Sequence, residues 1–299
     1  MIKEVDQFKN YMLNHGKSAT TVSNTVSDVK EFLSIMEIDS LDAIKELKPL
    51  DIEDYLSEIR ERGNSDNTRK TKVARVRVFF NFLFDNDLID KNVMRGQKIK
   101  CGIPEIVEFK HSDVVKVLNN ANSIREYTIL HTLMGTGMRV SELVELKCDK
   151  VFKDSRVQVF GKGNKWRMIQ CPEKVISVLL DYIEKTKDIR GNSPYVFVTK
   201  NGNKLDRSNI TSMLKDMAER AKIDNFEHFS AHKVRHMYGM YALNDLKIPL
   251  DVVSKNLGHS SVAITSQIYA KTNTERVKEY IDGVNENTFF GRKEHTFDK

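Results

Sequence analysis

The sequence has few cysteines and no long apolar run, and both absences limit the kind of protein it encodes. Only three cysteines occur in 299 residues, and Cys101, Cys148 and Cys171 are far apart in the chain. Their number and spacing suit neither a disulfide framework nor a zinc site, which favours a reducing cytoplasm. No apolar run approaches the roughly 18 residues of a membrane-spanning helix, and residues 1–6 lack the regions of a signal peptide. We therefore expect a cytoplasmic protein with no membrane segment.

Several motifs of nucleotide and metal chemistry are also absent. The chain has no complete Walker-type loop, no dinucleotide glycine motif on a βα turn and no acidic cluster for a two-metal nuclease. His232 and His236 are four residues apart and could bind zinc together with His259, but the Glu that metalloproteases place after the first His is missing. We therefore predict no metal and no cofactor.

The composition indicates a folded protein with a modest positive charge. Hydrophobic residues make up 40% of the chain, enough to build the core of one large domain or of two ordinary ones. Lys and Arg number 48 against 42 for Asp and Glu, which gives a net charge of +6. This excess favours a polyanionic partner only if the basic residues cluster, and a soluble protein with a mixed surface is the alternative.

Residues 1–90 have the apolar spacing of a helical domain. The pattern predicts a helical hairpin over 5–36, a third helix between Pro49 and Gly63, and a fourth over 67–84. The fourth helix could lay cations along a DNA backbone, with a solvated basic face as the alternative. Its candidate DNA-binding residues are Arg69, Lys70, Lys72, Arg75 and Arg77.

Residues 91–107 lack a helical period and are predicted to form a linker to a second domain at 108–299. In that domain, helical spacing occurs at 112–120, 124–134, 173–187 and 207–221. A period of two predicts a β-hairpin over 156–171 and a strand over 195–199. The fold class is therefore mainly α with a small β-sheet: an all-helical N-terminal domain followed by an α+β domain.

A group of cations in the second domain suits an anion. His232 and Arg235 are three residues apart on a predicted helix, so both project from one face. Arg139 stands near a helix start, where backbone N–H groups also point at an anion, and Glu142 could hold its guanidinium. A surface Arg–Glu pair is the alternative. Gly258 is expected to end a helix, so that His259 emerges from a fixed turn.

A tyrosine beside such cations could attack a phosphodiester. The five-coordinate transition state gains negative charge, which two fixed guanidinium groups would stabilise. The phenol, whose unperturbed pKa is about 10, must lose a proton and the leaving sugar oxygen must gain one, for which His and Lys are candidates. The covalent bond would conserve energy, so that rejoining would need neither ATP nor metal.

Five motifs in order carry a resemblance that sharpens this hypothesis. They are Thr136-Gly-Met-Arg139-Val-Ser-Glu142-Leu, Gly161-Lys162-Gly-Asn-Lys-Trp-Arg167, His232-Lys-Val-Arg235-His236, Leu257-Gly258-His259-Ser260 and Gln267-Ile-Tyr269. In order and spacing they resemble the motifs of the tyrosine recombinases, also called the phage integrase family. The resemblance covers nearly the whole chain. It implies a helical core-binding domain and a catalytic domain that together clamp DNA, in a two-domain layout similar to that of Xer-like members without an extra arm-binding domain.

The resemblance also implies a role for each motif residue. Arg139 and Arg235 would clamp the scissile phosphate, and Tyr269 would form a 3′-phosphotyrosyl bond. Lys162 would protonate the leaving 5′ oxygen, with Lys165 as a second basic candidate on the hairpin. The remaining residues are His232 for proton transfer around the tyrosine, His259 for a hydrogen bond to the phosphate, Glu142 for orienting the clamp, and His236 in a buried supporting position.

Two departures from the family pattern and two alternative functions stay open. Ala231 stands where Pro is common, and the spacing from His259 to Tyr269 is one residue longer than in some members. The expected function is site-specific recombination, for resolution or integration of DNA elements, by a tetramer on paired double-stranded sites. Residues 274–284 would form an amphipathic helix that docks on a neighbouring subunit or packs on its own domain. The alternatives are a non-catalytic architectural DNA-binding protein and a type IB topoisomerase-like relaxing enzyme.

Overall fold

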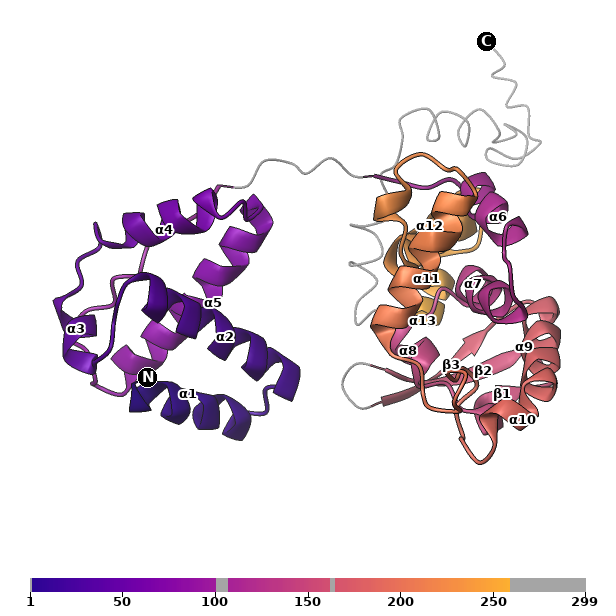
Figure 1. Ribbon diagram of the computed structural model, residues 1–299, viewed down its shortest axis with the longest axis horizontal. Coiled ribbons are helices and arrows are strands. Elements are labelled where there is room, and N and C mark those ends of the chain that lie inside the picture. Colours follow the sequence, from indigo (N-terminus) through magenta and orange to yellow (C-terminus); the bar gives the residue numbers. More distant parts are fainter. Residues whose placement is uncertain (1, 101–106, 162–164, 259–299) are drawn as a thin grey trace, which may run out of the picture. The chain divides into compact units, whose positions relative to one another are not determined.

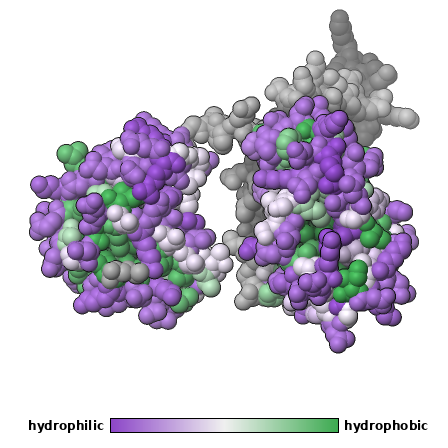
Figure 2. Space-filling view, in the orientation of Figure 1, coloured by the Kyte–Doolittle hydropathy of each residue, from purple (hydrophilic) through white to green (hydrophobic). Residues whose placement is uncertain are grey.

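The structure is a computed structural model that describes residues 2–100, 107–161 and 165–258. The chain divides into two compact units, residues 1–106 and residues 107–299, each with its own apolar core (Figure 1). On the face seen in Figure 2 the surface of each unit is mostly hydrophilic and is interrupted by smaller hydrophobic areas. Within the described ranges, none of the helices is both long and apolar enough to cross a membrane.

The first unit is helical, and three of its described helices begin at serine caps. Its elements are α1 (Lys3–Asn14), α2 (Ala19–Ile35), α3 (Leu41–Glu46), α4 (Ile52–Glu61) and α5 (Asp66–Asp85). The hydroxyls of Ser18, Ser40 and Ser65 accept hydrogen bonds from backbone N–H groups in the first turns of α2, α3 and α5. Such caps satisfy donors that a helix start otherwise leaves unpaired. The short helix α3 was not predicted from the sequence.

An aromatic cluster fills the core of the first unit. The rings of Phe8 and Phe79 are 5.3 Å apart, and the ring of Phe32 lies 4.9 Å from that of Tyr55, both in edge-on geometry. All four side chains are fully buried, and edge-on contacts between rings add to the stabilisation from burial alone. Phe32 also contacts Phe80 at 5.6 Å, so the core fixes α5 against both α1 and α2, and with it the direction in which the basic side chains of α5 point.

The chain after α5 still belongs to the first unit. Val93 and Met94 are buried in its core, and Ile99 packs against it. The guanidinium of Arg77 donates to the carbonyls of Met94 and Gln97, which fastens this segment to α5. The predicted linker at 91–107 thus overlaps a segment that packs on the first domain.

The second unit is a helical domain with one small antiparallel sheet. Its helices are α6 (His111–Asn119), α7 (Ile124–Thr136), α8 (Val140–Val144), α9 (Glu173–Lys185), α10 (Lys187–Arg190), α11 (Arg207–Arg220), α12 (Ala231–Asn244) and α13 (Leu250–Leu257). The strands are β1 (Val151–Phe152), β2 (Arg156–Gly161) and β3 (Lys165–Gln170), in the order β1-β2-β3. Helix α9 packs beside β1 and helix α13 beside β3 (Figure 1).

The β-hairpin predicted at 156–171 is confirmed, with Gly161 paired to Lys165 across its tip. Val157, Val159 and Ile169 are buried, so one face of the sheet lies on the core. The predicted class, mainly α with a small β-sheet, is also confirmed.

The strand predicted at 195–199 is wrong. Residues 196–198 are buried, but the segment forms only single bridges, from Tyr195 to Lys147 and from Val198 to Lys204. A run of Val and Phe fits any extended, buried segment, whether or not a neighbouring strand pairs along it. Burial, and not ladder pairing, accounts for the apolar pattern here.

Candidate active site

Arg235 is held by two backbone carbonyls. It lies on α12, which begins at the Ser230 cap, and only 5% of the residue is exposed. Its Nη1 donates to the carbonyl of Gly137 at 2.6 Å and its Nη2 to the carbonyl of Leu257 at 2.9 Å. Because carbonyl oxygens carry no net charge, these contacts fix the guanidinium plane and leave its full positive charge in place.

Arg139 is held by a buried carboxylate and by a third carbonyl. Its Nη1 donates to Oε1 of Glu142 at 3.1 Å, and its Nη2 donates to the carbonyl of Gly258 at 3.2 Å. Oε2 of Glu142 accepts from the backbone N–H of Arg139 at 2.7 Å, which caps the start of α8. A third of the Arg139 side chain stays exposed, whereas Glu142 is 1% exposed. The contact between the two side chains is the one their spacing predicts.

Two glycines with left-handed backbones supply carbonyls to this site. Gly137 (φ 60°) ends α7 and bonds Arg235, while Gly258 (φ 68°) ends α13 and bonds Arg139. A β-carbon at Gly137 would lie 2.4 Å from the ring of Tyr238, and one at Gly258 would lie 2.5 Å from Nε of Arg167. Neither the backbone angle nor the space admits a side chain at these positions.

His232 lies one turn before Arg235 on the same helix and is accessible to solvent. Partial burial, together with the positive charges of His236, Arg235 and Lys233, lowers the pKa of His232 below its ordinary value of 6.5. The ring is therefore neutral at pH 7 and can accept a proton. His236, expected in a buried supporting position, is 19% exposed, and its Nε2 lies 3.6 Å from Oε1 of Glu108.

The other expected site residues lie outside the described residues. These are Lys162, His259, Tyr269 and the helix expected at 274–284. Their described neighbours in sequence are the hairpin positions Gly161 and Lys165 and the helix end at Gly258. Among the residues it describes, the structure brings Arg139, Glu142 and Arg235 together around the two left-handed glycines.

Arg167 also belongs to this cluster, although the sequence interpretation gave it no role. Its Nη2 donates to Oε2 of Glu142 at 2.8 Å, so the buried carboxylate lies between two arginines. Arg167 pairs in register with the buried Val159 across β2 and β3. Cross-strand partners project from the same face of a sheet. The period of two in the hairpin was therefore a signal that Arg167 points inward.

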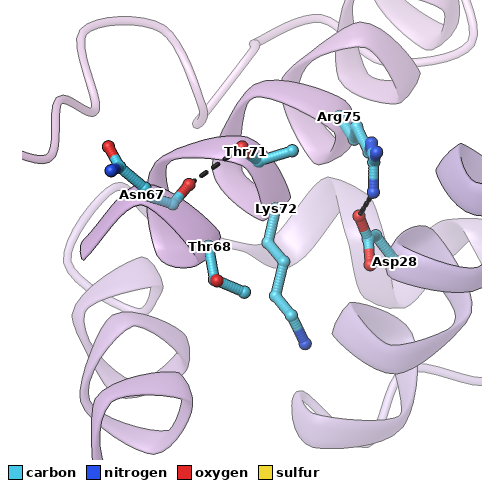
Figure 3. A pocket seen from close by; sticks show the side chains of 6 residues that line it. All are labelled: Asp28, Asn67, Thr68, Thr71, Lys72 and Arg75. Carbon is cyan, nitrogen blue, oxygen red and sulfur yellow. Dashed lines mark hydrogen bonds and ion pairs between the residues drawn. The ribbon is translucent and has the colours of Figure 1, made fainter. Parts of the chain in front are cut away.

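The cations of α5 in the first unit have a different kind of partner. Nη1 of Arg75 lies 2.6 Å from Oδ2 of Asp28, and Lys72 forms an ion pair with Glu31, both from α2. Figure 3 shows Arg75 and Asp28 on one side of a hollow of about 280 Å³ whose other lining side chains are Asn67, Thr68, Thr71 and Lys72. Arg69 pairs with Asp66 at 2.6 Å, and Lys70 is exposed. Lys165, expected to contact DNA from the hairpin, is also exposed.

An apolar groove of about 790 Å³ opens on the second unit between α7, α9, α12 and α13. Its apolar lining includes Met134, Val175, Tyr238, Tyr241, Leu246 and Val252. About half of the surface of Leu246 and of Val252 is exposed. Exposed apolar surface of this kind is typical of sites where proteins bind another segment or molecule.

Comparison with known proteins assigns both units. The model of the phage integrase family matches residues 106–276, and that of the phage integrase N-terminal SAM-like domain matches residues 5–87. The tyrosine recombinase XerC of Leptospira interrogans is 28% identical over 91% of this chain and 90% of its own length. A crystal structure of XerA recombinase is 26% identical, covers 98% of this chain and all of its own, and superposes with a TM-score of 0.53. A lambda integrase tetramer bound to a Holliday junction, 16% identical, shares the fold over 89% of this chain and 76% of its own, with a TM-score of 0.72.

Proposed function

The chain belongs to the phage integrase family, and from this premise we propose that it is a site-specific DNA recombinase that cuts and rejoins strands through Tyr269. The observation that carries the proposal is the arginine pair. Arg139 and Arg235 come from segments 96 residues apart (235 − 139), and both are fixed by carbonyls of left-handed glycines. Two immobilised guanidinium groups suit the charge that develops on a phosphate under attack.

In the proposed reaction, the phenol oxygen of Tyr269 attacks the phosphorus and the bond to the 5′ oxygen breaks. The neutral ring of His232 takes up the phenol proton, and the ammonium of Lys162 delivers a proton to the leaving 5′ oxygen. Arg139, Arg235 and His259 bind the nonbridging oxygens. The 3′-phosphotyrosyl bond conserves the energy of the broken bond, so a 5′ hydroxyl can reverse the step without ATP.

DNA is proposed to lie against the basic face of α5 in the first unit. Lys70 is exposed, and Lys72 and Arg75 border a hollow with the hydroxyls of Thr68 and Thr71, a combination that suits phosphate oxygens (Figure 3). Arg77 is engaged with two backbone carbonyls, so its contribution to DNA contact is expected to be smaller, whereas Arg69 is paired with the exposed carboxylate of Asp66, which a phosphate can replace. Because the substrate is DNA, we place the protein in the cytoplasm.

The protein is proposed to assemble as a tetramer on paired sites, as the lambda integrase neighbour does on a Holliday junction. Val277, Ile281 and Val284 recur at helical spacing in residues 274–284. Their apolar face would dock in the apolar groove of a neighbouring subunit. Substituting Glu for Val252 in the groove should abolish tetramers on junction DNA in sedimentation while leaving cleavage of a single site. Unchanged assembly would favour packing of this helix on its own domain.

A nicked DNA substrate tests the chemistry directly. A nick close to the cleavage point lets the short 5′ fragment diffuse away, so that a covalent protein–DNA adduct accumulates on a denaturing gel. We expect the adduct with the natural protein and none with Tyr269→Phe, while both bind the duplex equally. Equal adduct from both proteins would exclude Tyr269 as the nucleophile.

The two alternative functions have their own readouts in the same assays. An architectural DNA-binding protein would form no adduct with any DNA. A relaxing enzyme of the topoisomerase type would remove supercoils from plasmids that lack a specific site. We expect instead that cleavage requires a specific site.

A further inference from the structure

The outer edge of the hairpin is fastened to the end of α13 by one side chain. Strand β3 is one of the two edge strands of the sheet, and no other strand of the described ranges pairs with its outer backbone groups. The side chain of Asn256 takes that place: its Oδ1 accepts from the N–H of Gln170 at 2.9 Å, and its Nδ2 donates to the carbonyl of Gln170 at 3.0 Å. The hydroxyl of Tyr238 lies 2.8 Å from the same Nδ2. The amide of Asn256 therefore pairs with β3 as a strand residue would.

Arg167 makes a second connection between the same two elements. Its Nη1 donates to the carbonyl of Asn256 at 2.5 Å, while its Nη2 bonds the buried carboxylate of Glu142. The guanidinium also lies against the left-handed turn at Gly258, so closely that a β-carbon there would be 2.5 Å from Nε. Bonds from one planar group to a carbonyl and a carboxylate fix its orientation more firmly than a single contact would.

These contacts link three parts of the proposed site. Arg167 and Asn256 connect β3, which leads back to the hairpin tip and Lys162, with the end of α13, which leads to His259. Through Glu142 the same network reaches Arg139. A proton donor has to lie within hydrogen-bonding reach of the leaving oxygen, and a displacement of about 1 Å can cost about 100-fold in rate.

We propose that Asn256 and Arg167 are positioning residues that hold the β2–β3 hairpin against the end of α13, and that proton delivery by Lys162 depends on this attachment. This inference rests on the proposed function, in which Lys162 protonates the leaving oxygen. The proposal gives neither residue a direct part in the reaction. Their loss therefore acts through proton delivery, and this gives a specific signature.

A substrate whose leaving group needs no proton isolates that signature. With sulfur in place of the bridging 5′ oxygen, the group leaves as a thiolate, because thiols ionise near neutral pH whereas sugar hydroxyls do not. Cleavage of the oxygen and sulfur substrates is compared for the full-length natural protein, Lys162→Ala, Asn256→Ala and Arg139→Ala. Thermal unfolding of each variant shows whether it is folded. The milder variant Asn256→Asp is included because it keeps the acceptor for the N–H of Gln170.

We expect Asn256→Ala to cleave the oxygen substrate about 10- to 100-fold more slowly and to recover most of this loss with sulfur, and we expect the same recovery for Lys162→Ala. Asn256→Asp should lose less and recover in the same way, and Arg139→Ala should not recover. Asn201→Ala, an exposed asparagine of the same unit, is the matched control and should cleave both substrates normally.

The outcomes distinguish this inference from the proposed function. The positioning role alone is overturned if Lys162→Ala recovers on the sulfur substrate and Asn256→Ala does not. It is also overturned if Asn256→Ala cleaves both substrates at the normal rate. Failure of Lys162→Ala to recover on the sulfur substrate overturns the acid role of Lys162 and the inference with it.

Discussion

The positively charged groups of the two units differ in what holds them. Arg235 in the second unit is bonded to two neutral carbonyls, and Arg139 to a carbonyl and a carboxylate buried to 1% exposure. Lys72 and Arg75 in the first unit pair with the carboxylates of Glu31 and Asp28, whose side chains are 26% and 13% exposed. The first arrangement fixes a cation for a ligand, whereas the second neutralises a cation until a ligand replaces its partner.

This difference has an energetic meaning. A buried charge that loses its partner costs several kcal/mol, so the geometry around Glu142 is maintained whether or not DNA is present. The pairs of Lys72 and Arg75 with Glu31 and Asp28 are partly exposed, so breaking them costs less than breaking the contacts of Glu142, and phosphate oxygens can replace the two carboxylates. Under the proposed function, the second unit supplies a defined geometry and the α5 face of the first unit supplies adjustable affinity.

The largest expected effect follows from replacing the guanidinium group of Arg235. Arg235→Lys keeps the charge, but an ammonium cannot bond both the Gly137 and Leu257 carbonyls and still face a phosphate. We expect covalent adduct formation to slow by about 1000-fold, the upper range for losing one fixed donor to a transition state. The matched control is Arg207→Lys, exposed at the start of α11, which should retain normal rates. A loss below tenfold for Arg235→Lys would contradict the fixed-clamp account.

A second prediction compares a buried and an exposed carboxylate. Glu142→Gln leaves Arg139 and Arg167 together without a counter-charge, and we expect a loss of about 3 kcal/mol in the free energy of unfolding. Glu145→Gln removes the exposed pair with Lys204 and should cost less than about 1 kcal/mol. Urea unfolding of the two variants measures the difference. Equal values would mean that Glu142 contributes no more than a surface ion pair.

A third prediction concerns the counter-charges of α5. Asp28→Asn combined with Glu31→Gln frees Lys72 and Arg75 for phosphates, so affinity for random-sequence duplex should rise about tenfold. The plot of log affinity against log salt should steepen by up to about 2, near 0.9 for each additional phosphate contact. Fluorescence anisotropy from about 50 to about 200 mM salt measures both quantities. Asp42→Asn, which breaks the exposed pair with Lys45 on α3, is the control, and an unchanged slope in the double variant would exclude DNA contact at this hollow.

The clamp was more predictable from the sequence than its supports were. Arg139 and Glu142 are three residues apart, so their contact is local, and Gly137 and Gly258 mark helix ends by their type alone. The hydrogen bond between Arg167 and Asn256 joins positions 89 residues apart. Its acceptor is a backbone carbonyl, so the residue type at position 256 does not predict the bond. The hydropathy pattern also does not predict that the side chain of Asn256 bonds the backbone of Gln170 in place of a neighbouring strand.

The basic residues of α5 also show that a sequence pattern does not reveal the long-range partners of a side chain. The sequence grouped Arg69, Lys70, Lys72, Arg75 and Arg77 as one charged face. In the structure they divide, because α2 brings Asp28 and Glu31 next to two of them and the segment after α5 brings carbonyls to Arg77. Charge clustering along a helix predicts where cations are, but only packing decides which of them are already engaged.

The smallest expected effect is a difference in pH response between the two units. Partial burial and the nearby charges of His236, Arg235 and Lys233 lower the pKa of His232 below 6.5. As the pH falls below 6.5, His232 is protonated first in the unfolded chain, so the folded state loses stability in this range. In the folded protein the ring is protonated only at lower pH, and there it can no longer accept the phenol proton. Cleavage by the natural protein should therefore be constant from pH 8 to about 6.5 and decline below it, and this decline should be missing in His232→Gln. Binding of random duplex by the α5 face involves lysine, arginine and carboxylates and should stay constant over the same range, so parallel pH profiles of cleavage and binding would contradict the division between the units.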